Sequence, residues 1–91
     1  MTARLFALGQ VVATPGAIDT MERTGVAPFA LLARHMSGDW GDLGADDKQE
    51  NDFSVTRRLR ILSAYGQGDA RLWVITEADR SATTILRPDE Y

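Results

Sequence analysis

Residues 59–86, LRILSAYGQGDARLWVITEADRSATTIL, decide the fold. Three runs in this stretch are rich in β-branched and aromatic residues, which favour strands; they cover residues 59–65, 72–76 and 83–86. The segments between them, GQGD at 66–69 and EADRS at 77–81, are made of turn-forming residues. Because connections of four or five residues usually join antiparallel neighbours, we predict a C-terminal three-stranded meander.

The residues before this stretch predict one more strand and a layer of helices. Residues 5–13 alternate loosely and predict an opening strand, with a bulge, at the edge of the meander. Thr14 followed by Pro15 is typical of a capped helix start, and Gly25 is a natural helix end. We therefore expect a first short helix over residues 15–24.

Two further helices are expected in the middle of the chain. The first starts at Pro28, ends at Gly38 and carries apolar residues at helical spacing, namely Phe29, Leu32, Ala33 and Met36. The second is expected over residues 46–53, because the acidic residues at its start are typical of the first turn of a helix. Ile18 and Met21 should be the buried residues of the helix over 15–24.

Length and composition indicate one α+β domain over residues 1–91, with a small, mainly antiparallel sheet packed against two or three short helices. The chain has 91 residues, of which 44% are hydrophobic and 25% charged, as in ordinary globular proteins. Such a small domain buries limited surface on folding, and a homodimer would bury more, so a homodimer is one possible partner. The absence of cysteine excludes disulfides and thiolate chemistry.

Charge and hydropathy narrow the classes of partner and location. The formal charge of −3 makes nucleic acid an unfavourable partner, because phosphate binding needs a surplus of basic residues on one face. No apolar run approaches the roughly 20 residues of a membrane span, so we expect no membrane partner. The N-terminal residues resemble a strand more than a secretory signal, which favours a cytoplasmic protein.

An acidic run marks residues 39–52. It contains six acids and one lysine, a local net charge of −5. These carboxylates are explained by a solvated helix face, or by interaction with the positive end of a helix dipole. The alternative is that they imitate the phosphates of DNA and so block a nucleic-acid-binding protein.

Seven polar or aromatic residues form the candidate binding site: His35, Asp39, Trp40, Asp42, Glu77, Asp79 and Arg80. An imidazole near carboxylates suits a metal ion or a general base. The spacing matches no specific metal or nucleophile motif, so we assign no catalytic residue, no metal ligand and no cofactor. A structural histidine and a tryptophan that folds back onto the core are the simpler interpretations.

Three arginines follow the acidic run, at positions 57, 58 and 60. They would suit a nucleic-acid backbone, which gives the hypothesis of a plasmid gene regulator that contacts DNA through Arg57, Arg58 and Arg60. Arginines in such positions more often pair with acids that lie close in space. The second interpretation is favoured.

Three segments resemble a family of small uncharacterised bacterial proteins. They are GDWGD at residues 38–42, RILSAY at 60–65 and WVITEADRSATTIL at 73–86, together with the ending PDEY. Genes of this family often lie on plasmids and integrative elements, and the resemblance extends over nearly the whole chain. It implies no activity, cofactor or catalytic residue, but its motifs contain the seven candidate residues, which we expect to converge at one end of the sheet.

The favoured function is a non-enzymatic protein-binding module of a mobile genetic element. Its partner would be a protein, and an inhibitor of a host defence or restriction component is one form of this hypothesis. The alternatives are a small enzyme with a polar site of His35, Asp39, Asp42 and Arg80, and the DNA-contacting regulator. Partner, ligand and reaction are not specified by the sequence.

Overall fold

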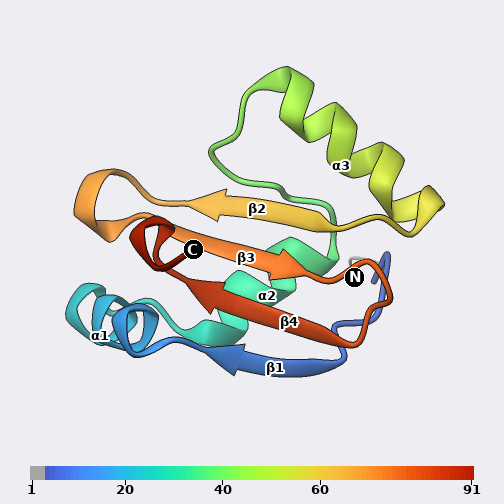
Figure 1. The fold of residues 1–91 in the computed structure, drawn as a ribbon. Coiled ribbons are helices and arrows are strands. Elements are labelled where there is room, and N and C mark those ends of the chain that lie inside the picture. Colours follow the sequence, from blue (N-terminus) through green and yellow to red (C-terminus); the bar gives the residue numbers. More distant parts are fainter. Residues whose placement is uncertain (1–3) are drawn as a thin grey trace.

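A four-stranded mixed sheet forms the centre of the computed structural model, which describes residues 4–91 (Figure 1). The strand order is β1-β4-β3-β2. The last three strands in sequence pair antiparallel, which confirms the C-terminal meander, and β1 pairs parallel with β4. The strands are β1 Gln10–Ala13, β2 Ile61–Tyr65, β3 Leu72–Thr76 and β4 Ala82–Leu86.

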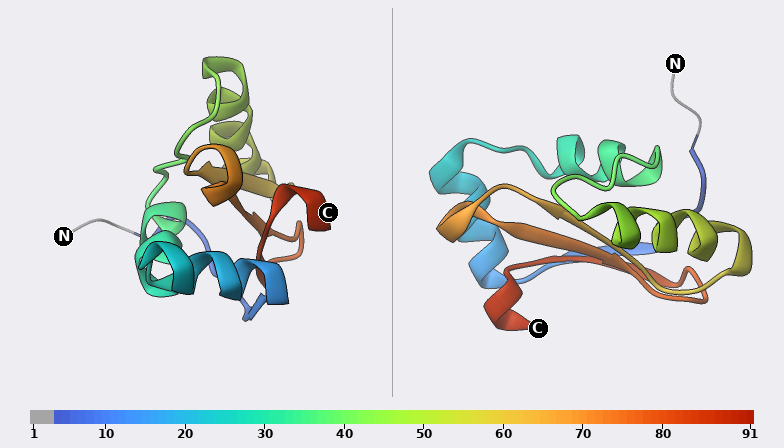
Figure 2. Two further views of the ribbon diagram at one scale, coloured as in Figure 1. Left: turned by 90° about the vertical axis from the view of Figure 1, so that its left-hand side faces the viewer. Right: turned by 90° about the horizontal axis from the view of Figure 1, so that it is seen from above.

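Three helices and two short 3-10 turns surround the sheet. Helices α1 and α2 cover one face, whereas α3 stands beyond the β2 edge (Figure 2). The sheet face turned away from α1 and α2 is called the open face below. The helices are α1 Pro15–Thr24, α2 Pro28–Met36 and α3 Ala45–Arg57, and the 3-10 turns are η1 Gly68–Ala70 and η2 Pro88–Glu90.

The predicted local signals set the ends of α1. The Thr14 hydroxyl accepts a hydrogen bond from the backbone N–H of Ala17 at 3.2 Å, and Gly25 adopts a left-handed φ of 75° after the last turn. Helix α3 runs further than predicted and ends at Arg58, which takes the left-handed conformation with φ 55°. Tertiary contacts of its last turn, described below, override the β-branched residues near its end.

The expected first strand is much shorter than residues 5–13. Only Gln10–Ala13 pairs with β4, because the chain bends at Gly9, whose φ is 65°. A Cβ at Gly9 would lie 2.3 Å from the Ser81 carbonyl oxygen, so only glycine allows this close approach. The predicted irregularity therefore marks the start of the strand.

The main core lies between the sheet and helices α1 and α2. It consists of Ala17, Met21, Leu31, Tyr65, Leu72, Val74 and Ile85. The apolar stripe predicted for α2 is wrong at Phe29, which is 77% exposed. The helix instead buries Leu31 and His35. Ile18, expected to be buried, is 47% exposed. The hydrogen bonds of His35 to the sheet, described below, fix this rotation of α2.

The outer edge of β2 is closed by side-chain and loop contacts. The loop before α3 pairs with Ala64, whose N–H donates to the Trp40 carbonyl at 3.1 Å and whose carbonyl accepts from the Asp42 N–H at 2.6 Å. The Asn51 side chain of α3 does the same for Leu62: its amide nitrogen donates to the Leu62 carbonyl at 2.7 Å, and its oxygen accepts from the Leu62 N–H at 3.3 Å. Asn51 thus replaces a neighbouring strand.

Replacing Asn51 with leucine should lower the free energy of unfolding by roughly 2 kcal/mol, because both backbone groups of Leu62 lose their partner. Denaturant unfolding measures this loss. Gln49→Leu, an exposed change on the same helix, is the control for the higher helix propensity of leucine. Equal stabilities of the two variants would show that Asn51 does not hold the edge.

Candidate functional site

His35 lies at the centre of a buried chain of hydrogen bonds between α2 and the sheet. Its Nδ1 is 2.5 Å from the Ser63 hydroxyl, and its Nε2 is 2.9 Å from the Thr76 hydroxyl. The Thr76 hydroxyl is 2.7 Å from that of Thr83, which donates to the carbonyl of Leu8 at 2.8 Å. Because the Thr83 hydroxyl donates its proton to a carbonyl, it accepts from the Thr76 hydroxyl. The Thr76 hydroxyl in turn accepts from His35 Nε2–H, so Nδ1 carries no proton and accepts from the Ser63 hydroxyl.

This chain fixes a neutral histidine with its proton on Nε2. Burial lowers the pKa of His35 to about 3, and the positive charge of Arg80 adds to the effect. The imidazole is fully buried and both ring nitrogens are occupied within the core. His35 therefore acts as a polar anchor of α2 on the sheet, and it has no free nitrogen for a metal ion or a substrate.

Arg80 and Trp40 join His35 around the ring of Phe6. The Phe6 ring centroid lies 5.1 Å from that of His35, 6.2 Å from that of Trp40 and 5.5 Å from the guanidinium carbon of Arg80. Trp40 is only 3% exposed, and its indole N–H donates to Asp52 Oδ1 at 2.9 Å. The structure thus brings three of the seven candidate residues together, but inside the molecule.

Arg80 connects three segments of the backbone through one guanidinium group. Its Nη1 donates to the carbonyls of Leu59, Glu77 and Ala78 at 2.7, 3.1 and 3.3 Å, and its Nη2 donates to that of Ser54 at 3.0 Å. The last turn of α3, the residue after its C-cap and the β3–β4 connection are therefore held by the same side chain. This contact explains why α3 continues beyond Phe53.

The two candidate aspartates before α3 lie in the loop that follows α2. Asp39 accepts from Arg34 Nε at 2.6 Å and from the N–H of Gly41 at 3.2 Å, and the bond from Arg34 is the main reason that its pKa is lowered. Asp42 accepts from the N–H of Gly66 at 2.9 Å. Both carboxylates stabilise the loop that closes the β2 edge.

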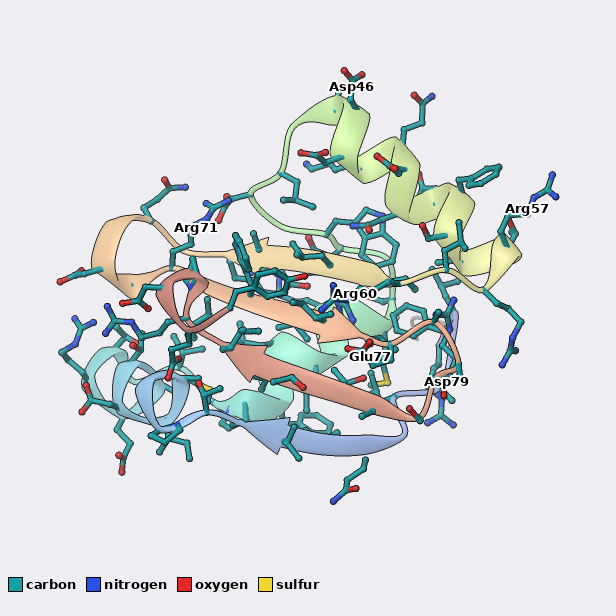
Figure 3. All side chains as sticks on the ribbon, in the orientation of Figure 1. Asp46, Arg57, Arg60, Arg71, Glu77 and Asp79 are labelled. Atoms are coloured by element: carbon teal, nitrogen blue, oxygen red, sulfur yellow. The ribbon has the colours of Figure 1, made fainter. Side chains whose placement is uncertain are left out.

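The remaining two candidates lie in the β3–β4 connection (Figure 3). Glu77 is 3.8 Å from Arg60, so this arginine pairs with an acid that lies close in space, as predicted. Asp79 accepts from the N–H of Ser81 at 3.0 Å, and hydrogen bonds from Ser81 lower its pKa. The seven residues therefore divide into one buried cluster and two separate loops.

Residues 4–91 contain no group of three or more histidines and carboxylates placed to hold a metal ion. Within the same range, no helix is long and apolar enough to cross a membrane.

A groove of about 580 Å³ lies between α3 and the open face, a feature that the sequence did not predict. Leu62 and Trp73 form its floor, since they alternate with Ser63 and Val74, which face the helices. The wall on α3 carries the acids Asp47 and Glu50, and the opposite side carries Arg60 and Arg71. The other lining residues are Leu43, Asn51, Ser54 and Leu59.

Arg60 and two aromatic rings form a ledge beside this groove. Arg60 Nη1 donates to the Tyr91 hydroxyl at 2.5 Å, and its guanidinium carbon lies 5.1 Å from the centre of the Tyr91 ring. That ring meets Trp73 edge to face, with centroids 5.7 Å apart. Tyr91 is 68% exposed, so the ledge is accessible from solvent.

Strand alternation is the signal that could have found part of this groove. Positions 60, 62, 71 and 73 share one face once the register of β2 with β3 is known. The position of α3 beside the β2 edge has no comparable signal in the sequence.

No protein-family model, no curated protein and no solved structure matches this chain.

Proposed function

We propose that the chain is a non-enzymatic protein-binding module that holds a segment of a partner protein in the groove between α3 and the open face. The groove itself carries this proposal. Its volume lies in the range of about 300–1,000 Å³ that is usual for ligand pockets, and its floor is apolar. Its two sides have opposite charge, which suits a peptide segment with an apolar face flanked by basic and acidic residues.

The chemistry of the groove favours binding over catalysis. Catalytic acid–base groups are typically shielded from water and paired with a second reactive group, whereas the groove carboxylates belong to the exposed residues Asp47 and Glu50. Ser54, the hydroxyl residue of the groove, donates its proton to the backbone carbonyl of Glu50 at 2.9 Å. His35, the one histidine of the chain, bonds to Ser63 and Thr76 on the opposite face of the sheet.

The charges also favour protein over nucleic acid as the partner. Of the three arginines that suggested DNA contact, Arg60 pairs with Glu77 and Arg57 stacks on Phe53 at 5.1 Å. The groove places Asp47 and Glu50 where a phosphate backbone would be repelled. The resemblance to plasmid-borne proteins motivates a component of a host defence or restriction system as the partner.

A charge reversal on the groove wall tests this proposal. Asp47→Lys should lower the recovery of specific partners from a bacterial lysate about tenfold, equivalent to ~1.4 kcal/mol of binding, because a basic group of the segment would meet another cation. Asp46→Lys is the matched control. Asp46 is also in the first turn of α3 but points away from the sheet (Figure 3).

The two variants change the net charge and the helix dipole interaction equally, so a difference between them reports on the groove. Captured proteins are identified by mass spectrometry, and circular dichroism confirms that both variants are folded. Equal recovery with Asp47→Lys and Asp46→Lys, or no specific partner for the wild type at low salt, would refute the proposal.

A further inference from the structure

The free edge of β1 has unpaired backbone groups. The N–H groups of Gln10 and Thr14 donate to the carbonyls of Ser81 and Ile85 on β4 at 2.9 and 3.0 Å. Because parallel pairing uses alternate residues of a strand, Val11 and Ala13 direct their N–H and C=O groups away from β4. No element of the described chain lies beyond β1 on this side (Figure 1).

The two edges of the sheet are treated differently. At β2, the loop before α3 and the Asn51 side chain occupy the outward backbone groups. At β1, the valines Val11 and Val12 are 43% and 42% exposed, and residues 9–14 carry no charge. Proteins usually protect an exposed edge with charges, proline or a covering segment, since it otherwise pairs with another strand.

We infer that β1 pairs with β1 of a second copy of this chain, in an antiparallel arrangement about a two-fold axis at Val12. Pairing Val11 of each copy with Ala13 of the other is the register that uses all the outward N–H and C=O groups of both residues. Val12 then lies directly opposite Val12. The two sheets join into one continuous sheet of two copies.

A hollow beside Ala13 fits this register. It has a volume of about 220 Å³ and is lined by Ala13, Ile18, Met21, Glu22, Val26 and Pro28. Val11 of the second copy would lie next to Ala13 on the same face of the joined sheet and so enter the hollow. Ile18 and Val26, which are 47% and 37% exposed, would be covered by the same contact.

A dimer interface of standard size would cover a small share of the surface of this chain. A standard interface removes about 800 Å² from each partner, roughly 15% of the 5359 Å² surface of the chain. The uncharged edge brings no like charges together at its centre. The groove at α3 lies beyond the opposite edge, so the dimer leaves both copies of it free, and loss of one function does not imply loss of the other.

Single cysteines test the register, because the chain has none of its own. Two Val12 positions would form a non-hydrogen-bonded pair with Cα atoms about 4.5 Å apart, within disulfide range. Two Val11 positions would be diagonal neighbours about 7–8 Å apart, which is too far. Under mild oxidation, Val12→Cys should form a disulfide-linked dimer and Val11→Cys should not; linking of Val11→Cys alone, or of neither variant, would overturn the inference.

Light scattering after size exclusion tests the edge independently. The wild type should have a mass of about 20 kDa, twice the 10.0 kDa of the chain. Val11→Lys places a charge on the edge and should halve this mass, whereas Phe53→Lys, an apolar position on α3 with a similar exposed fraction (52% against 43%), should not. A monomeric wild type, or a dimer that survives Val11→Lys in folded form, would contradict the proposed interface.

Discussion

Replacement of Arg80 with methionine should lower the free energy of unfolding by roughly 3–4 kcal/mol. The guanidinium group donates to four backbone carbonyls and is only 8% exposed. Hydrogen bonds from a charged donor contribute about 1.5–3 kcal/mol each. The expected loss is smaller than the sum of four such bonds, because the carbonyls of Ser54 and Glu77 also accept from the backbone N–H groups of Leu59 and Arg80. Methionine keeps an apolar stem and removes the guanidinium group, which also lies over the Phe6 ring, so the loss reports on that group.

Arg58→Met is the matched control for this variant. Arg58 and Arg80 are the two non-glycine residues with positive φ among residues 4–91, at 55° and 61°, so both substitutions meet the same backbone restriction. Arg58 is exposed, and its loss should change stability by less than about 0.5 kcal/mol. Denaturant unfolding measures both variants, and amide hydrogen exchange should show faster opening of the last turns of α3 in Arg80→Met alone. Equal stability of the two variants would show that the guanidinium group of Arg80 does not stabilise the fold.

The role of Arg80 illustrates what the sequence does not contain. Its four acceptors belong to residues 54, 59, 77 and 78, which are adjacent only after α3 and the meander have packed. By contrast, the limits of α1 depend on neighbours in the chain, Thr14 with Pro15 and Gly25, and could be predicted residue by residue. Local signals thus specify elements, and tertiary contacts specify functions of buried polar residues.

The rotation of α2 shows the same limit in the helix layer. Phe29 and Met36 suggested an apolar stripe, but the hydrogen bonds of His35 with Ser63 and Thr76 turn the opposite flank inward. Those partners are 28 and 41 residues away. A polar anchor of this kind outweighs one more buried phenylalanine, because leaving a buried hydroxyl and imidazole unpaired costs several kcal/mol in total. Hydrophobic periodicity alone does not report the cost of leaving a buried polar group unpaired.

Acidification should destabilise the protein in a pH range set by His35. The folded state holds a neutral imidazole whose pKa is lowered to about 3, whereas the unfolded chain binds a proton near the ordinary value of 6.5. Between these values the unfolded state binds more protons, so stability rises with pH and is complete above about 6.5. From pH 8 to pH 4.5 we expect the free energy of unfolding to fall by roughly 2.7 kcal/mol.

The carboxylates act in a different range, which separates their effect from that of His35. Hydrogen bonds, chiefly from Arg34, Ser81 and Thr14, lower the pKa values of Asp39, Asp79 and Glu90. Their contribution to stability is present above the unfolded values near 4 and is lost only as the pH falls below them. The decline between pH 6.5 and 4.5 therefore belongs to His35, the one histidine of the chain.

His35→Gln tests this assignment, because an amide can bond to Ser63 and Thr76 but does not titrate. The variant should be less stable than the wild type at pH 8 and should lose almost no further stability down to pH 4.5. Denaturant unfolding at several pH values measures both curves. In the folded wild type, the single histidine Cε1 proton should keep a constant NMR shift down to pH 4.5. A titration midpoint near 6.5 would mean that the imidazole is accessible to solvent protons and that the buried chain from Ser63 to Leu8 is not closed. The same decline in both proteins would mean that groups other than His35 cause it.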